Sequence, residues 1–441
     1  STPKPSSAAS DVYKRQELML AKIAKAGFKI VNEAGLADVV IINTCGFIQS
    51  AKEEAIEEIM EAISRKNDGI NKKIIVTGCL AERYQKQMDE EFPEIDAVVG
   101  IAKNDDIVEI INSVMLDRRV ITFGDKLCHN MEGDKLQSTL PHYAYLRIAD
   151  GCSNKCSYCA IPLIRGKMRS RKMENIIEEA KKFAENGVKE LVIVAQDVTA
   201  YGIDLYKKYA LPDLLKQLCK IDGIKWIRLL YCYPERMTDE LIETIKTEDK
   251  VLNYIDIPIQ HCNKEILRNM YRGGDEQSLR ELFAKLRREI PGVVLRTTLI
   301  TGFPGETEEQ FSELAEFVND IKFERLGCFA YSAEEDTPAA EMPDQVDEGE
   351  RQRRADIITS EQEIRMGEYY AGMVGNTYEV VCEGFDRYSD MYFGRSMHFA
   401  PEIDGMIYFT SAKDKGSLTI GDFVNVKITD VLENNLLGER V

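Results

Sequence analysis

The chain has 441 residues, 44% of them hydrophobic and 30% charged, which is long enough for two or three globular domains. Its formal net charge of −18 disfavours general nucleic-acid binding, because neutralising phosphates needs a surplus of Lys and Arg. No apolar run reaches the roughly 18 residues of a membrane-spanning helix, and the first residues show no apolar secretory signal. We therefore expect a cytoplasmic protein whose eleven cysteines serve metal or redox chemistry rather than disulfides.

The N-terminal part divides into a leader and an α/β domain. Residues 1–16 are rich in Ser, Ala and Pro and lack periodicity, which predicts a disordered or foreign leader. Over residues 17–123, helical patterns alternate with short apolar runs, which predicts a parallel sheet covered on both faces. The predicted strands span residues 37–45, 72–79 and 97–100, and the predicted helices span residues 17–28, 50–66, 81–93 and 104–116.

Two of these predicted strands end in cysteine, at Cys45 and Cys79. One strand–helix–strand unit separates them, and neighbouring parallel strands place their carboxyl ends at one edge of the sheet. A single cysteine in a core is ordinary, but the repeated placement favours a metal site at this edge.

Residues 124–141 predict a linker, and a second alternation of strands and helices follows it. Six strand–helix units predict a partial (β/α)6, TIM-like barrel within residues 142–370, with a charged connecting helix from Glu348. The predicted strands span residues 143–149, 190–197, 226–232, 251–259, 292–300 and 325–332, and the helices between them span residues 173–186, 211–220, 238–247, 275–289 and 307–319.

The tail, residues 371–441, changes character. Short strand patterns at residues 376–385, 391–398, 406–412 and 423–432 are separated by Gly- and Asp-bearing turns. This pattern predicts a small antiparallel β-barrel. The tail holds 6 Lys and Arg against 11 Asp and Glu, a net charge of −5.

A cysteine triplet, Cys152, Cys156 and Cys159, follows the first barrel strand, where active sites of such barrels gather. Zinc sites usually complete four ligands in paired sets, and the nearby His142 is better explained as a structural residue. Three thiolates on one tight loop suit an iron–sulfur cluster and leave one iron without a protein ligand. Three unrelated buried cysteines would be a coincidence at this spacing.

The stretch GCSNKCSYCAIP resembles the signature of the radical S-adenosylmethionine (SAM) enzymes. The resemblance implies that Cys152, Cys156 and Cys159 hold a [4Fe–4S] cluster, and that the amino and carboxylate groups of SAM chelate its open iron. It also implies that Tyr158 packs near the adenine. No catalytic residue beyond the cluster ligands is predicted.

Other candidates for cofactor binding follow later strands of the predicted barrel. Gln196 and Asp197 come after the second strand, where this superfamily contacts the methionine amino group. Arg296 could reach a carboxylate or could form an ion pair within the barrel. GFPGET, residues 302–307, lacks the Lys of a phosphate-binding loop and predicts a strand-to-helix turn near the cofactor, with Thr307 as N-cap.

Over residues 17–441 the layout resembles the radical SAM methylthiotransferases, which join an N-terminal α/β domain, a radical SAM barrel and a TRAM β-barrel. The stretches NTCGFIQSAKEEAIEEI, YCYPE, IDIPIQH and GFPGET are most similar to the branch that modifies an aspartate of ribosomal protein S12. The resemblance implies two [4Fe–4S] clusters and SAM as cofactors, with Cys45 and Cys79 on the second cluster. The expected reaction adds a methylthio group to the aspartate β-carbon.

One departure concerns the second cluster. The family carries a third cysteine for it on an opening strand, and the leader stands in that place here. We expect a truncated start and a second cluster impaired by the missing cysteine, because Cys128 in the linker is a poor substitute.

The expected partners are ribosomal protein S12 or the ribosome, and an electron donor such as flavodoxin or ferredoxin. An acidic tail disfavours an RNA backbone and favours a Lys/Arg-rich protein. A methylthiotransferase acting on a tRNA adenosine and a non-catalytic iron–sulfur protein are the alternatives. We expect a monomer without membrane contact.

Overall fold

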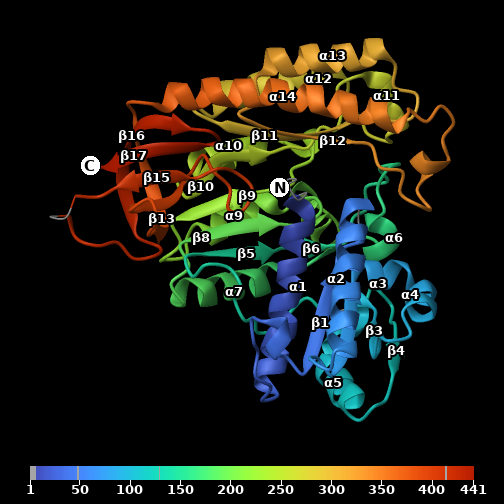
Figure 1. The fold of residues 1–441 in the computed structure, drawn as a ribbon. Coiled ribbons are helices and arrows are strands. Elements are labelled where there is room, and N and C mark those ends of the chain that lie inside the picture. The colour runs from blue at the N-terminus through green and yellow to red at the C-terminus, as the bar shows by residue number, and fades with distance from the viewer. Residues whose placement is uncertain (1–5, 47–48, 129, 413–414) are drawn as a thin grey trace. The chain divides into compact units, whose positions relative to one another are not determined.

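The computed structural model describes residues 6–46, 49–128, 130–412 and 415–441, with only the backbone described for residues 6–15 (Figure 1). The chain forms two compact units. Unit 1 comprises Ser1–Ser138, Asp150–Arg169 and Ser332–Ala340, and unit 2 comprises Thr139–Ala149, Ser170–Tyr331 and Glu341–Val441. No helix in the described part of the chain has the length and apolarity to cross a membrane.

Unit 1 contains the predicted parallel sheet, in the order β1-β2-β3-β4. Its strands are β1 (Val39–Thr44), β2 (Lys73–Gly78), β3 (Ala97–Val99) and β4 (Val120–Thr122). Its helices are α1 (Ser6–Lys25), α2 (Gln49–Asn67), α3 (Cys79–Arg83), α4 (Gln85–Glu91), α5 (Ile107–Met115) and α6 (Ile161–Arg165), with the short 3-10 helices η1 (Ala34–Leu36), η2 (Ile101–Asp106) and η5 (Pro338–Glu341).

The two faces of this sheet have separate cores because successive strand residues point to opposite sides. Ile74 and Val76 pack with Ile59 of α2 on one face. Ile75 packs with Ile110 of α5 on the other face, where Met19 and Ile23 of α1 complete the cluster. The strands are therefore buried on both sides, as their near-continuous apolar runs predicted.

Two expectations for unit 1 are wrong in part. Residues 6–16 lie in helix α1, so the disorder predicted for them is wrong, whereas the alternative of a foreign leader stays a prediction and residues 1–5 lie outside the described residues. The predicted helix over 81–93 is two helices, because the backbone at Tyr84 leaves the helical region with φ −111° and ψ 35°.

Unit 2 contains a six-stranded parallel sheet in the order β12-β11-β10-β9-β8-β5, which confirms the predicted partial barrel. Helix α14 runs along β11 and β12 (Figure 1). The strands are β5 (Tyr143–Arg147), β8 (Glu190–Val194), β9 (Trp226–Leu229), β10 (Val251–Asp256), β11 (Val294–Thr301) and β12 (Arg325–Ala330), and β6 (Ala149–Asp150) pairs with β7 (Arg169–Ser170) in a separate ribbon. The helices are α7 (Met173–Glu185), η3 (Val198–Ala200), α8 (Ile203–Tyr206), α9 (Leu211–Leu218), η4 (Pro234–Arg236), α10 (Asp239–Thr247), α11 (Lys264–Asn269), α12 (Glu276–Glu289), α13 (Glu308–Ile321) and α14 (Glu348–Met373).

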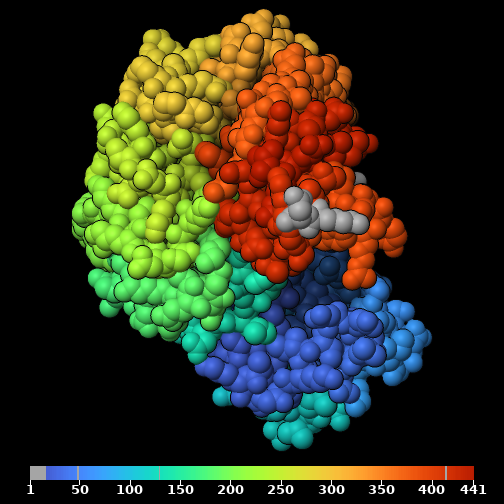
Figure 2. Space-filling view, turned by 90° about the vertical axis from the view of Figure 1, so that its left-hand side faces the viewer, coloured from blue at the N-terminus to red at the C-terminus, as the bar shows by residue number. Residues whose placement is uncertain are grey.

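The tail is also part of unit 2 and forms a small closed β-barrel, in the order β13-β14-β15-β17-β16. The predicted barrel is confirmed, but it is not antiparallel throughout, because β15 and β17 pair in parallel. Its strands are β13 (Thr377–Asp386), β14 (Met391–Ser396), β15 (Ile407–Thr410), β16 (Phe423–Leu432) and β17 (Asn435–Arg440). Figure 2 shows the tail in red against the segments of unit 2 coloured green and yellow. Val381 and Ala400 of the tail share a core cluster with Tyr143, Tyr145 and Tyr254 of the larger barrel. The tail therefore fills one end of that barrel's interior.

Candidate functional site

The cysteine-bearing loop of unit 1 is closed by its own backbone. Gly151 has φ +75°, and a Cβ there would lie 2.4 Å from the carbonyl oxygen of Lys167, so only glycine fits this turn. The backbone N–H of Cys152 donates to the carbonyl of Gly166 at 3.2 Å, and that of Met168 donates to Ser153 Oγ at 3.2 Å. These contacts bring residues 151–153 against residues 166–168.

The loop gathers the three predicted ligands within one short span. Cys152, Cys156 and Cys159 are half-buried thiols, and the N–H of Cys159 donates to the carbonyl of Cys156 at 3.1 Å. In the described residues, no three metal-ligating side chains converge as they would around a single ion. Ligands of a cluster bind different irons, so their sulfurs lie farther apart than those of one ion. The donor set, three partly exposed thiols on one loop, fits a cluster, and half-buried Tyr158 lies between two of them.

Cys45 and Cys79 lie at the same edge of the unit 1 sheet, as predicted. Strands β1 and β2 pair in parallel with Thr44 opposite Gly78, the residues just before the two cysteines. A Cβ on Gly46 would lie 2.7 Å from the backbone nitrogen of Leu80, so the two chain segments touch. Cys79 is 5% exposed and Cys45 is half-buried. Two thiols supply only part of the ligand set that the resemblance implies for a second cluster.

Arg165 connects the cysteine loop to this edge within unit 1. Its guanidinium lies 3.6 Å from Cys79 Sγ through Nη2 and 3.1 Å from Asp150 Oδ1 through Nη1. The side chains of Arg165 and Asp150 are both buried, and Ile164 of α6 packs in one core cluster with Cys79. The sequence alone assigns Arg165 no specific contact. Its link to Cys79 depends on how α6 packs against α3, which no local pattern shows.

Asp197 stabilises the local structure after β8 in unit 2. Its carboxylate caps η3, accepting from the N–H of Ala200 at 3.2 Å and from Thr199 Oγ1 at 2.5 Å, and it forms an ion pair with Arg236. Its neighbour Gln196 is half-buried directly after β8. Both residues follow the carboxyl end of a barrel strand, where ligands bind in such folds.

Arg296 forms the ion pair that the sequence left open as an alternative. Its Nη1 donates to Asp256 Oδ1 at 2.8 Å, from β11 to the last residue of β10. Burial lowers the pKa of Arg296, but the Asp256 carboxylate outweighs this and holds it above its ordinary value. Arg296 is therefore a buried, fully charged guanidinium.

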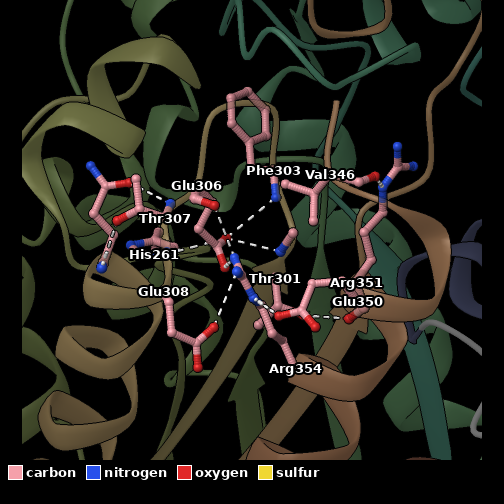
Figure 3. Close-up of polar contacts among 12 residues, drawn as sticks. His261, Thr301, Phe303, Glu306, Thr307, Glu308, Val346, Glu350, Arg351 and Arg354 are labelled. Atoms are coloured by element: carbon pink, nitrogen blue, oxygen red, sulfur yellow. Dashed lines mark hydrogen bonds and ion pairs between the residues drawn. The ribbon is translucent and has the colours of Figure 1, made fainter. Parts of the chain in front are cut away.

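The loop that joins β11 to α13 is held by one carboxylate (Figure 3). Glu306 Oε2 accepts from the N–H groups of Gly302 at 2.9 Å and Phe303 at 3.3 Å, and its Oε1 accepts from Arg354 of α14 at 2.9 Å. His261 Nε2 lies 3.7 Å from the same carboxylate. Burial raises the pKa of Glu306 despite these donors.

The same loop confirms the predicted helix start. Thr307 caps α13, since its side chain accepts from the N–H of Gln310 and the Gln310 side chain accepts from the N–H of Thr307. This reciprocal pair is a capping box.

Comparisons with known families define the class of protein. A model described as the Radical SAM superfamily matches residues 146–318, and a TRAM domain model matches residues 374–441. Residues 12–100 match a family described as the uncharacterized protein family UPF0004. Two solved structures of the radical SAM methyltransferase TsrM from Kitasatospora setae support the fold alone, with TM-scores of 0.54 and 0.52 at 12% and 13% identity, covering 71% and 75% of this chain and 69% and 73% of theirs. The fold is that of a radical SAM protein.

Curated relatives identify the family within the radical SAM class. Proteins described as ribosomal protein uS12 methylthiotransferase RimO are similar over nearly the whole chain. The relative from Thermoanaerobacter sp. (strain X514) is 47% identical and that from Caldanaerobacter subterraneus subsp. tengcongensis 48%, each alignment covering 96% of both chains. The relative from Clostridioides difficile (strain 630) is 45% identical, covering 96% of this chain and 95% of its own. The chain belongs to the RimO family of radical SAM methylthiotransferases, which confirms the predicted resemblance.

Proposed function

We propose that this enzyme adds a methylthio group to the β-carbon of an aspartate in ribosomal protein uS12. The observation that carries the proposal is the placement of two cysteine sets in unit 1, the triplet of residues 152–159 and the edge pair Cys45 and Cys79. The relatives are named for ribosomal protein uS12, which supports the choice of acceptor.

The cysteine triplet would hold the [4Fe–4S] cluster that makes SAM a source of radicals. Such a cluster, with SAM on its open iron, supplies the radical that removes hydrogen from an unactivated carbon, which acid–base chemistry cannot readily do. Gly151 and the Cys152–Gly166 hydrogen bond fix the loop that carries the thiolates. Tyr158, Gln196, Asp197 and Arg296 are the proposed residues for contacts with bound SAM or substrate.

Cys45 and Cys79 would belong to a second cluster near the same loop of unit 1. Arg165 would place a positive charge 3.6 Å from one of its sulfurs, and hydrogen bonds to cluster sulfurs tune reduction potentials. The reducing electron would come from a small donor protein such as flavodoxin or ferredoxin, and we propose a cytoplasmic monomer.

The acidic tail supports a protein acceptor over a tRNA. Its net charge of −5 repels an RNA backbone but attracts a basic ribosomal protein. A tRNA methylthiotransferase and a non-catalytic iron–sulfur protein remain outcomes of the test below.

Anaerobic reconstitution tests the proposal. The triplet should bind roughly four irons, and the second cluster should add fewer than about four because one of its ligands is missing. Cys156→Ala should lose roughly four irons together with 5′-deoxyadenosine formation. Cys219→Ala, a cysteine of unit 2 outside both sets, should keep its iron and its activity. With SAM and a reductant, uS12 should gain a methylthio group and tRNA should not. Methylthiolation of tRNA alone, or no deoxyadenosine with either substrate, would contradict the proposed function.

A further inference from the structure

The inner face of the unit 2 barrel carries several arginines, and most have tasks within the fold. Arg228 donates to the carbonyl of Met397 in the tail at 2.9 Å and pairs with Glu190 at 2.7 Å. Arg325 lies 3.5 Å from Asp404 of the tail. Arg147 is fully buried. Arg296 also faces inward, as Val294 two residues earlier does, but it differs from the other three in keeping 8% of its surface accessible.

The surroundings of Arg296 fix its guanidinium without using all of its donors. Asp256 accepts from Arg296 Nη1 on one oxygen and from the N–H of Tyr231 on the other, at 3.1 Å. Within the described residues this is the one hydrogen bond that the structure gives the Arg296 side chain. A guanidinium has five N–H donors in a planar fork, so most of its donor capacity is available to a ligand.

The backbone around this pair is strained. Tyr231 has φ +65° and Gln260 has φ +70°, which are left-handed values that residues other than glycine rarely adopt. This conformation orients the backbone N–H of Tyr231, which donates a hydrogen bond to the Asp256 carboxylate. Strain of this kind collects at functional sites, where it fixes a group in one orientation.

We propose that Arg296, oriented by Asp256, binds the side-chain carboxylate of the acceptor aspartate. The inference rests on the proposed function, since an aspartate is an anion that must enter a low-dielectric barrel interior. A charged guanidinium there meets a carboxylate through two parallel hydrogen bonds. An adenosine offers no carboxylate, so Arg296 would also select the protein acceptor over a nucleoside.

The carboxylate of SAM has the same chemistry, and the experiment separates the two sources. Equilibrium binding of uS12, and of uS12 with its acceptor aspartate changed to asparagine, is measured with the reconstituted chain and its variants. Arg296→Met should weaken binding of the aspartate form at least tenfold and leave the asparagine form unchanged, because the double-mutant cycle isolates this pair. Arg288→Met, which removes an exposed arginine of the same unit, should change neither. SAM binding should stay within about twofold in every variant.

Arg296→Lys is the control for loss of folding, since it keeps the positive charge beside Asp256 but lacks the planar fork of guanidinium donors. It should bind the aspartate form more weakly than the unsubstituted chain and more tightly than Arg296→Met. Equal weakening of both uS12 forms, or loss of SAM affinity with uS12 binding intact, would overturn the proposal. A chain that methylthiolates uS12 while Arg296→Met keeps full preference for aspartate would overturn the Arg296 role but not the proposed function. A chain that binds neither uS12 form would overturn both.

Discussion

The imidazole of His261 is held neutral by its surroundings (Figure 3). Its side chain is 0% exposed, and its Nδ1 accepts from the N–H groups of Cys262 at 3.0 Å and Asn263 at 2.9 Å. This arrangement assigns the proton to Nε2, next to Glu306. Burial, with a smaller contribution from Arg354, lowers the pKa of His261 to about 3.

This lowered pKa predicts acid sensitivity. Because the folded-state pKa lies below the unfolded value of about 6.5, the stabilisation is complete above pH 6.5 and is lost as pH falls toward 3. When the pH falls from 7 to 5, protonation of His261 in the unfolded state should lower the free energy of unfolding by about 2 kcal/mol. His261→Asn keeps an acceptor for the two N–H groups and should remove this pH dependence. Urea unfolding at both pH values measures it, and an unchanged slope in the variant would contradict the assignment.

At the scale of elements, the junction of β2 and α3 is set by Gly78. Its φ of +100° and ψ of −161° lie in a region reserved for glycine, and a Cβ would stand 2.3 Å from the carbonyl oxygen of Thr44. This close approach brings the ends of β1 and β2 together and so places Cys45 beside Cys79.

Gly78→Ala should therefore destabilise the folded protein strongly. Backbone strain and overpacking together predict a loss of about 2–6 kcal/mol in unfolding free energy. Gly69→Ala is the matched control, because Gly69 also has a positive φ, +73°, but a Cβ at that position would have nothing within 4 Å. That variant should cost only about 1–2 kcal/mol in denaturant titrations. Equal costs at the two positions would show that the contact with Thr44 is unimportant.

Strongly patterned elements could be predicted from sequence, and very short or atypical ones could not. All six strands of the larger barrel lie within their predicted ranges, apart from the last residue of β11. Strand β4 was missed because it is a short, partly exposed edge strand, whereas the equally short β3 is fully buried and was predicted from its apolar run. Strand β17 was missed because Asn435–Arg440 combines polar residues with Gly438. Gly438 is required there, since a Cβ would lie 2.5 Å from Val426 Cγ1. The shared edge of Cys45 and Cys79 followed from chain order, whereas Arg165 and the Asp256–Arg296 pair arise from tertiary packing.

At the scale of the whole molecule, a buried charge network joins the tail to the larger barrel within unit 2. Arg395 of β14 donates to Glu190 of β8 at 2.8 Å and to Glu383 of β13 at 2.7 Å. Burial raises the pKa of Glu190, but Arg395 and Arg228 outweigh it and lower that pKa to about 2. Glu190 also pairs with Arg228 within the larger barrel, so the tail supplies its second cationic partner, Arg395.

Arg395→Met should leave Glu190 and Glu383 buried with too few partners. Breaking a buried pair in this way typically costs about 3–5 kcal/mol. Lys225→Met removes another tail contact, the exposed pair with Glu379, and should cost about 1 kcal/mol or less. Chemical denaturation of both variants compares the two, and an Arg395→Met loss no larger than that of Lys225→Met would contradict the role of the network.

The segment Ser332–Ala340 gives unit 1 a dependence on the order of synthesis. Its Glu334 accepts from buried Lys52 at 3.1 Å and from Arg83 at 2.8 Å, yet Lys52 precedes it by 282 residues. At typical elongation rates of about 5–20 residues per second, Glu334 is made roughly 14–56 s after Lys52. During that interval the nascent unit 1 carries two cations without their shared carboxylate. The contacts of Lys52 and Arg83 with Glu334 can therefore form only after most of the barrel has been translated.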